Sequence, residues 1–414
     1  MSVVTQNKLL SFAEARRIVE EYAGVSAPTE PELTNLLDAV NLVLAEDLLA
    51  DRDFPPFPRA TRDGYAVLAT DVRFVPAQLR IVGSIKAGAS VEDSVVSVVP
   101  GDCVEIMTGA PVPTAADAVV MVEYTQAVGD KVMVNRGVRP GENVVAAGAE
   151  ARRGDVMVPR GTRVHHAVVA IAAAVGRPEL AVHRRPRVAV LATGDELVDI
   201  NLPPGPNEIR NSNTYSLAAQ INEAGGEAVL LPVARDEADE LALLLGKGLN
   251  ADLLLLTGGV SMGKYDLVEE VLASLGAEFF FSGVAIQPGK PVVFGQVKAD
   301  GKTKPFFGLP GNPVSTMVTF QLFVRPVFDA LAGSEPEPLS FAQAKLKEPF
   351  TTKTGLTRFL PAHLAGTHED PEVELVRWQG SGDLVAASKA NCYIVVPPDL
   401  EKFEKGKVIS VLRF

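Results

Sequence analysis

The stretch 252–266 reads DLLLLTGGVSMGKYD and decides the fold of the region around it. Four consecutive leucines are typical of a strand that is buried on both faces of a sheet. The strand leads into Thr257-Gly258-Gly259, and a helix is predicted to start near Asp266. Open α/β sheets bind ligands where strands end in this way. The stretch therefore predicts a ligand-binding α/β domain.

The same alternation of strand and helix runs through residues 183–335. RVAVLA (187–192) and EAVLLPV (227–233) are predicted strands. NSNTYSLAAQINEAGG (211–226) is a predicted amphipathic helix with an Asn/Thr start and a Gly-Gly stop. A long helix is predicted to begin at Pro313. Apolar strands alternating with amphipathic helices predict a central, mostly parallel sheet with helices on both faces.

A second glycine-containing loop follows another apolar strand, in FFGLPGNP (306–313). Glycines allow backbone N–H groups to turn toward an anion, so two such loops at equivalent sheet positions favour a phosphate site over simple tight turns. Neither loop has Walker A or GxGxxG spacing, which disfavours ordinary ATPases and dinucleotide-binding enzymes. The predicted ligand-binding residues of the two loops are Thr257, Gly258, Gly259, Ser261, Gly308, Pro310, Gly311, Asn312 and Pro313.

The flanking regions follow different patterns. Residues 8–50 are predicted to be helical, because apolar side chains recur there at helical spacing. Short β-like runs separated by Gly, Pro and Asp follow. The predicted fold is a multidomain α/β plus β protein, with the central sheet domain flanked by β-rich domains and an N-terminal helical segment. The predicted domains are 1–50 with 140–182 (discontinuous, helical/β), 51–139 (inserted β), 183–335 (α/β) and 336–414 (C-terminal β).

Composition narrows the class of protein. A chain of 414 residues with 47% apolar residues has enough material for several packed domains. The formal net charge of −12 disfavours a broad nucleic-acid surface, but it is compatible with an anionic small ligand. Two cysteines give no disulfide framework. The most apolar run, Val164–Val175, is too short to span a bilayer. These features favour a soluble cytoplasmic protein.

Carboxylates follow several predicted strands of the α/β region. Asp195, Glu196, Asp236 and Asp266 all lie just beyond strand ends, where hard oxygen ligands near phosphate loops favour Mg²⁺. Helix capping is the alternative interpretation for Asp236 and Asp266. Lys290, in QPGKPVVFG, is the candidate cation for an oxyanion. Because no nucleophile has a histidine partner, metal-assisted transfer is favoured over covalent catalysis.

Read in order, the motifs resemble those of molybdopterin molybdenumtransferases, whose architecture also forms the E domain of gephyrin. The resemblance covers essentially the whole chain. The matching segments are PPFPRATRDGYAV, IMTGAPVPTAADAVV, GENVVAAGAEARRGDVMVPRGTRV, LATGDELV, IRNSNTYSLA, LTGGVSMGKYDLV, IQPGKPVVFG and GLPGNPVSTMVTF.

The resemblance implies an elongated homodimer, with dimerisation through residues 1–50 and 140–182. It also implies that molybdenum from molybdate is inserted into adenylylated molybdopterin, with divalent metal and release of AMP. The adenylyltransferase and molybdoenzyme apoproteins are possible partners. The implied active cleft lies between subunits. The residues that match functional positions are Asp63, Thr108, Glu196, Asp236, Asp266, Lys290, Pro310 and Pro313, with Arg358 and Ser381 from the C-terminal domain.

Three positions depart from the family pattern. Arg62 stands where a methionine is common, Glu150 where an aspartate follows an arginine-rich stretch, and Gln287 where a lysine is common. They keep open a non-catalytic ligand-binding paralogue. A molybdopterin adenylyltransferase is about the size of residues 183–335 alone, so the flanking domains disfavour that alternative. A gephyrin-like scaffold is disfavoured because this chain lacks the extra adenylyltransferase domain of gephyrin. The choice between molybdate and tungstate stays open.

Overall fold

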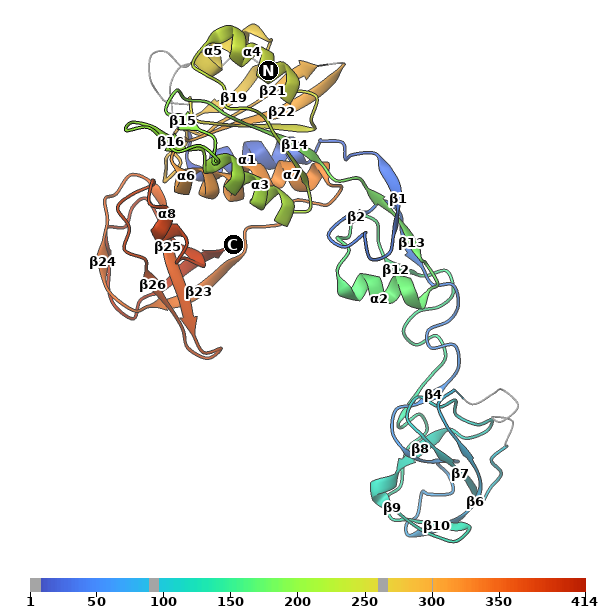
Figure 1. Cartoon of the computed structure of the whole chain (residues 1–414). Coiled ribbons are helices and arrows are strands. Elements are labelled where there is room, and N and C mark those ends of the chain that lie inside the picture. Colours follow the sequence, from blue (N-terminus) through green and yellow to red (C-terminus); the bar gives the residue numbers. More distant parts are fainter. Residues whose placement is uncertain (1–8, 89–96, 260–266, 300) are drawn as a thin grey trace.

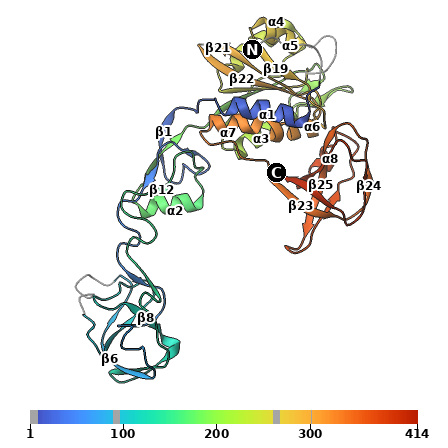
Figure 2. The same ribbon diagram turned by 180° about the vertical axis from the view of Figure 1, so that it is seen from behind.

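The computed structural model describes residues 9–88, 97–259, 267–299 and 301–414. The molecule is elongated, with the central sheet and the C-terminal β region at one end and a small β region at the other (Figure 1). A narrow arm made of two separate chain segments joins the ends. The view from behind shows the same separation (Figure 2).

The central sheet has six strands in the order β17-β14-β18-β22-β21-β19. The first four pair in parallel, and β21 and β19 are antiparallel to their neighbours. Strand β18 therefore lies inside the parallel part, as its four leucines predict. The strands are β14 (Arg187–Ala192), β17 (Glu227–Leu230), β18 (Leu253–Thr257), β19 (Glu278–Ser282), β21 (Val293–Ala299) and β22 (Lys302–Leu309).

Helices cover both faces of this sheet. Successive leucines of β18 point to opposite sides, so apolar side chains must be buried on each face. Leu253 and Leu255 join a core with α1, α3, α6 and α7. Leu254 and Leu256 join a second core with α4 and α5. The helices are α1 (Phe12–Ala23), α3 (Asn213–Glu223), α4 (Ala238–Gly248), α5 (Leu267–Ser274), α6 (Pro313–Thr319), the π-helix Phe320–Val324 and α7 (Arg325–Leu331).

The N-terminal segment differs from its prediction. Helix α1 forms as expected, with Ser11 and Glu14 making reciprocal capping hydrogen bonds. The helical prediction for the rest of residues 8–50 is wrong. Residues Pro31–Asn35 form strand β1, which pairs with β13 at Glu179–His183. Helix α1 also packs into the core of the central sheet, so the prediction that groups it with residues 140–182 does not describe its packing.

The reason for the error is non-local pairing. The apolar spacing of residues 31–40 resembles a helix, but Leu33 and Leu37 are 71% and 75% exposed and bury no helical face. The backbone of β1 instead satisfies its hydrogen bonds on a strand about 150 residues later in the chain. Local periodicity carries no information about that partner.

The arm is built from segments on both sides of the inserted small β region. The arm contains the sheet β1-β13-β2, the pair β3-β12 and helix α2, and the small β region contains the sheet β8-β5-β7-β6-β10-β9. The elements are β2 (Val43–Leu44), β3 (Leu48–Leu49), β4 (Arg59–Ala60), β5 (Gly64–Val67), β6 (Ala77–Ile85), β7 (Asp102–Ile106), β8 (Ala118–Met121), a 3₁₀ turn (Val122–Tyr124), β9 (Thr125–Val128), β10 (Lys131–Val134), β11 (Val144–Val145), β12 (Val156–Val158) and α2 (His166–Ala174).

The C-terminal sheet closes on itself. Its order is β20-β25-β26-β23-β29-β27, and β27 also pairs with β25. Strand β20 belongs to the chain of the central region, so this pairing ties the two regions together. The remaining elements are β15 (Leu197–Val198), β16 (Ile209–Arg210), β20 (Ile286–Gln287), β23 (Phe341–Leu346), β24 (Phe350–Thr351), β25 (Thr357–Gly366), β26 (Pro371–Leu375), α8 (Leu384–Ala387), β27 (Cys392–Val396), β28 (Lys402–Phe403) and β29 (Val408–Arg413). Among the helices in the described ranges, none is both long and apolar enough to cross a membrane.

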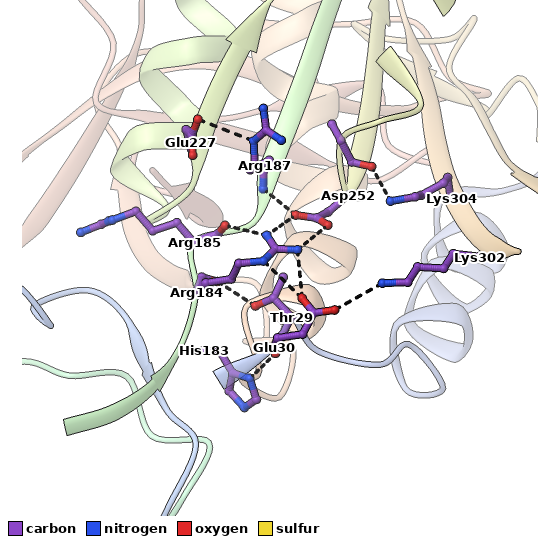
Figure 3. Close-up of polar contacts among 11 residues, drawn as sticks. Thr29, Glu30, His183, Arg184, Arg185, Arg187, Glu227, Asp252, Lys302 and Lys304 are labelled. Atoms are coloured by element: carbon purple, nitrogen blue, oxygen red, sulfur yellow. Dashed lines mark hydrogen bonds and ion pairs between the residues drawn. The ribbon is translucent and has the colours of Figure 1, made fainter. Parts of the chain in front are cut away.

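An ion-pair network holds the arm against the central sheet at the ends of the strands far from the glycine loops. The guanidinium of Arg184 donates two hydrogen bonds to Asp252, of 2.7 and 2.9 Å, and also contacts Glu30 at 3.2 Å (Figure 3). The backbone N–H of Arg187 donates to Asp252 at 2.8 Å. His183 Nδ1 bonds to the carbonyl oxygen of Thr29 at 2.6 Å. These contacts fix the direction in which the arm leaves the sheet.

Asp252 is expected to stabilise the fold in a pH-dependent way. Burial would raise its pKa, but the hydrogen bonds from Arg184 and from the N–H of Arg187 outweigh burial and lower the pKa. A lowered carboxyl pKa stabilises the fold above the unfolded pKa of about 3.9, and the contribution is lost as the pH falls through the folded pKa. We expect Asp252→Asn to lower the free energy of unfolding by about 2 kcal/mol at pH 7.

Thermal unfolding of the two proteins from pH 7 down to pH 3 measures this difference. The gap should narrow as the pH falls, because wild-type Asp252 then loses its charge. Exposed Asp399→Asn is the matched control and should show no such gap. A gap for Asp252→Asn that stays constant with pH would contradict the assignment.

Candidate functional site

The two glycine loops meet at the carboxyl edge of the central sheet. Thr257 is the last residue of β18 and is only 1% exposed. A Cβ on Gly311 would lie 3.5 Å from the Cα of Gly258, so the two loops are in contact. The prediction that equivalent strand ends bring these loops together is confirmed.

Glycine is required at Gly258 by its backbone. Gly258 has a φ of +86°, and a Cβ there would lie 2.3 Å from the carbonyl oxygen of Thr193. Gly259 has a φ of +64°, and its Cβ would lie 2.4 Å from Thr193 Oγ1. Gly308 differs from its prediction as a loop residue: it is a buried residue of β22, paired with Leu256 and Val293.

A pocket of about 740 Å³ opens beside these loops. Its walls come from the ends of β14, β18 and β22, the start of α3 and the C-terminal region. The predicted residues that line it are Glu196, Thr257, Gly258, Pro310, Gly311, Asn312 and Pro313. The lining residues that were not predicted include Thr193, Asn213, Pro291, Gly382 and Leu384.

The C-terminal region contributes to the pocket through residues next to Ser381, whose predicted role in substrate binding stays a prediction. The carbonyl oxygen of Ser381 accepts a hydrogen bond from the N–H of Val314 at 3.0 Å, just after the loop that ends at Pro313. Its neighbours Gly382 and Leu384 line the pocket. Two regions far apart in sequence thus form one site.

Three of the predicted carboxylates lie at the ends of β14 and β17. Asp195 Oδ1 accepts a hydrogen bond from the N–H of Asp236 at 3.4 Å. Burial, together with the negative charges of Asp195 and Glu196, raises the pKa of Asp236. Residue 237, and not Asp236, is the N-cap of α4, so the capping alternative for Asp236 is wrong. Like charges held together favour a cation nearby.

The described carboxylates do not make up a metal site by themselves. Within residues 9–88, 97–259, 267–299 and 301–414, no group of three or more His, Cys, Asp or Glu side chains is arranged to hold a metal ion. Asp266, the fourth predicted ligand, and Ser261, a predicted ligand-binding residue, lie outside the described residues. The set of four carboxylates therefore stays a prediction.

Lys290 and Arg358 lie near the junction of the central and C-terminal regions. Lys290 is exposed and precedes Pro291, which lines the pocket. Arg358 is 6% exposed, and its Nε donates to Gln287 Oε1 at 2.8 Å. Burial lowers the pKa of the Arg358 guanidinium. Gln287 carries no charge to offset that of Arg358, but its Oε1 accepts a hydrogen bond from the guanidinium. A lysine at this position could not accept that bond.

Asp63 and Thr108 adjoin β5 and β7 of the small β region, and Figure 1 shows that the arm separates this region from the central sheet. Asp63 Oδ1 accepts from the N–H of Thr108 at 2.6 Å and from its hydroxyl at 2.8 Å. These bonds lower the pKa of Asp63. Nearby, Glu150 accepts from Arg59 at 2.8 Å. The single chain therefore does not bring Asp63 and Thr108 to the central pocket.

The fold and the pocket are those of a multidomain protein with a candidate ligand site at the carboxyl edge of an α/β sheet. Family models match the MoeA N-terminal region (domain I and II) over residues 10–176, a probable molybdopterin binding domain over 189–330 and the MoeA C-terminal region (domain IV) over 343–414. The molybdopterin molybdenumtransferase of Bacillus subtilis is 34% identical over 392 residues, which covers 92% of this chain and 90% of that protein. The chain belongs to the molybdopterin molybdenumtransferase family.

Other relatives agree. A molybdopterin molybdenumtransferase of Staphylococcus aureus is 33% identical over 418 residues, covering 99% of this chain and 97% of that protein. A crystal structure of the molybdopterin biosynthesis MoeA protein from Pyrococcus horikoshii OT3 matches with a TM-score of 0.80 and 27% identity, over 98% of this chain and 100% of that chain. The resemblance stated from the motifs is confirmed.

The contact between Gln287 and Arg358 gives a stability prediction. Gln287→Lys would place an ammonium group against a buried guanidinium whose Nε has lost its acceptor, although its Nη1 still donates to the carbonyl oxygen of Leu356. We expect it to lower the free energy of unfolding by about 1–3 kcal/mol. Thermal and urea unfolding measure the change, and Gln126→Lys on exposed β9 is the matched control with little effect.

A double-variant cycle identifies the cause of this loss. Arg358→Gln removes the second positive charge, so Gln287→Lys should cost much less in that background. An equal loss with and without Arg358 would show that charge repulsion is not responsible.

Proposed function

We propose that this chain inserts molybdenum from molybdate into adenylylated molybdopterin, with release of AMP, in molybdenum cofactor biosynthesis. The observation that carries the proposal is the pocket formed by Thr257 and Gly258, the Pro310–Pro313 loop and the C-terminal Gly382 segment in a member of this family. Backbone N–H groups of glycine loops suit a pyrophosphate. The pocket volume of about 740 Å³ lies in the range of nucleotide-sized ligands.

The carboxylates are proposed to act through a divalent cation. Asp195, Glu196 and Asp236, with Asp266, would hold Mg²⁺, which would offset the negative charge of the phosphate oxygens during cleavage of the phosphoanhydride. The raised pKa of Asp236 supports this role, because a cation would relieve the repulsion that raises it. Lys290 is exposed at the junction of two regions, and we propose that its ammonium group contacts the departing phosphate.

The remote position of Asp63 supports a site shared between two subunits. The arm holds Asp63 and Thr108 away from their own pocket, so we propose that they complete the pocket of a partner chain in a homodimer. Apart from helix α1, which packs into the core of the central sheet, the proposed units are residues 1–50 with 140–182 for dimerisation, 51–139 as the inserted β domain, 183–335 as the molybdopterin-binding domain and 336–414 as the C-terminal domain. Arg358 and Ser381 would position substrate from the last of these.

We place this activity in the cytoplasm, with the adenylyltransferase that makes its substrate and the molybdoenzyme apoproteins that take its product as partners. AMP release from adenylylated molybdopterin in the presence of molybdate and Mg²⁺ tests the function. Wild-type protein should release AMP, and chelation of divalent cations should suppress the release. The absence of AMP release from wild-type protein under these conditions would contradict the proposed function.

Complementation between variants tests the shared site. Asp63→Asn and Glu196→Gln homodimers should each lose AMP release by at least about 100-fold. A heterodimer of the two variants has one site in which both mutated residues meet and one site with neither, so it should regain activity at one of its two sites. Exposed Asp130→Asn is the control for Asp63→Asn. Two inactive variants that never complement would place Asp63 with its own pocket or outside the site.

A further inference from the structure

One amide nitrogen joins the two glycine loops. Asn213, the first residue of α3, donates from Nδ2 to Thr257 Oγ1 at 2.9 Å and to the carbonyl oxygen of Gly311 at 2.7 Å. The carbonyl of Gly311 only accepts, so the amide group must present its nitrogen to the loops. Both N–H groups of Asn213 are used, and its Oδ1 is directed away from them.

Further hydroxyl groups extend this connection. Thr257 Oγ1 donates to the carbonyl oxygen of Pro310 at 3.4 Å, and Thr316 Oγ1 donates to the same oxygen at 2.6 Å. The loop after β18 and the loop after β22 are therefore held at a fixed spacing by side chains of α3, β18 and α6. Asn213 lies outside both loops and hydrogen-bonds to each of them.

Capping does not explain Asn213. The helix start is capped by another residue: the N–H of Thr214 donates to Asn211 Oδ1 at 3.2 Å, and Asn211 Nδ2 donates to Thr214 Oγ1 at 2.9 Å. The side chain of Asn213 is thus available for the pocket, which it lines.

Two buried oxygen atoms beside this connection have no hydrogen-bond partner among the described residues. They are Asn213 Oδ1 and Thr193 Oγ1, and both residues line the pocket. Thr193 is 2% exposed, and its hydroxyl faces the Gly258-Gly259 turn. Burying such atoms without a partner costs free energy, so a ligand group that satisfies them gains affinity.

The chemistry of these atoms selects the ligand group. Asn213 Oδ1 only accepts hydrogen bonds. An ionised phosphate also only accepts them, so the two groups cannot bond to each other. The phosphate part of a ligand is therefore disfavoured at Asn213 Oδ1, and an N–H group is favoured. Fused nitrogen heterocycles, such as a pterin or an adenine, carry amino groups of this kind.

We propose that Asn213 is a specificity-determining residue that sets the spacing of the two loops and, together with Thr193, binds an amino or ring N–H group of the heterocycle of the substrate. This inference rests on the proposed function. It assigns the Asn213–Thr193 wall to the heterocycle and leaves the glycine loops to the phosphates.

Three variants separate the two roles of this wall. Thr193→Val has nearly the same shape and leaves the contacts of Asn213 intact. Asn213→Asp keeps acceptor oxygens but loses both N–H donors. Asn213→Ala loses the donors and the acceptor oxygen. Ser216→Ala, one turn further along α3, is the matched control. Circular dichroism and thermal unfolding check that each variant folds.

Calorimetric titration with molybdopterin, AMP and purine riboside 5′-monophosphate measures recognition. If the wall binds adenine, wild-type protein should bind AMP about three- to tenfold more tightly than purine riboside 5′-monophosphate, and Thr193→Val should remove this difference. If the wall binds the pterin, Thr193→Val should weaken the binding of molybdopterin by about the same factor and leave the affinities for both nucleotides unchanged. Either result supports the proposal. Unchanged affinity of folded Thr193→Val and Asn213→Ala for all three probes would overturn it.

AMP-release kinetics test the positioning role. Thr193→Val should raise KM with little change in kcat, because it removes binding only. Asn213→Asp should lower kcat by at least about tenfold, because the loops lose their common donor. Equal kcat for Asn213→Asp and wild type would overturn the positioning role. If wild-type protein binds the probes with the expected selectivity but releases no AMP, the proposed function fails while recognition by this wall stands.

Discussion

The burial of β18 on both faces is the constraint on which the rest of the structure depends. Its leucines alternate between a helical layer with α3, α6 and α7 and a second layer with α4 and α5. A strand held in this way ends at one place only, with Thr257 at the carboxyl edge. The tight approach of Gly258 to the carbonyl oxygen of Thr193 then fixes the turn that forms the pocket wall. Sheet packing thus determines the position of the site.

The pocket combines groups with opposite electrostatic needs. Glycine loops are suited to bind an anion through backbone N–H groups. Glu196, which lines the pocket, carries a negative charge that acts on Asp236 together with the charge of Asp195. These requirements are compatible when a divalent cation lies between carboxylates and phosphate, which is the arrangement that the proposed function needs. Gln287 stands at a position where a lysine is common in the family. Its uncharged side chain suits this place, because it accepts a hydrogen bond from the buried guanidinium of Arg358.

The elongated shape has a functional consequence. Arg184, Asp252 and Glu30 hold the arm against the central sheet (Figure 3). The arm separates the small β region, which contains Asp63, from that sheet (Figure 1). A carboxylate fixed by Thr108 at the end of such an arm has an ordered environment but no pocket within its own chain. Completion of the site by a partner chain is the proposal that gives both observations one cause.

Local sequence patterns by themselves determined the strands and helices of the central region and the two loops, because buried strands and amphipathic helices have periodicities that adjacent residues reveal. The family followed from the resemblance of the motifs along the chain. Only the tertiary structure decided the rest. Strand β1 depends on β13, about 150 residues away, so its spacing was misread as a helix. Asn213 was read as part of a helix start, although its side chain joins Thr257 to Gly311. The physical reason is that a hydrogen-bond partner distant in sequence leaves no local periodicity in the residues that it contacts.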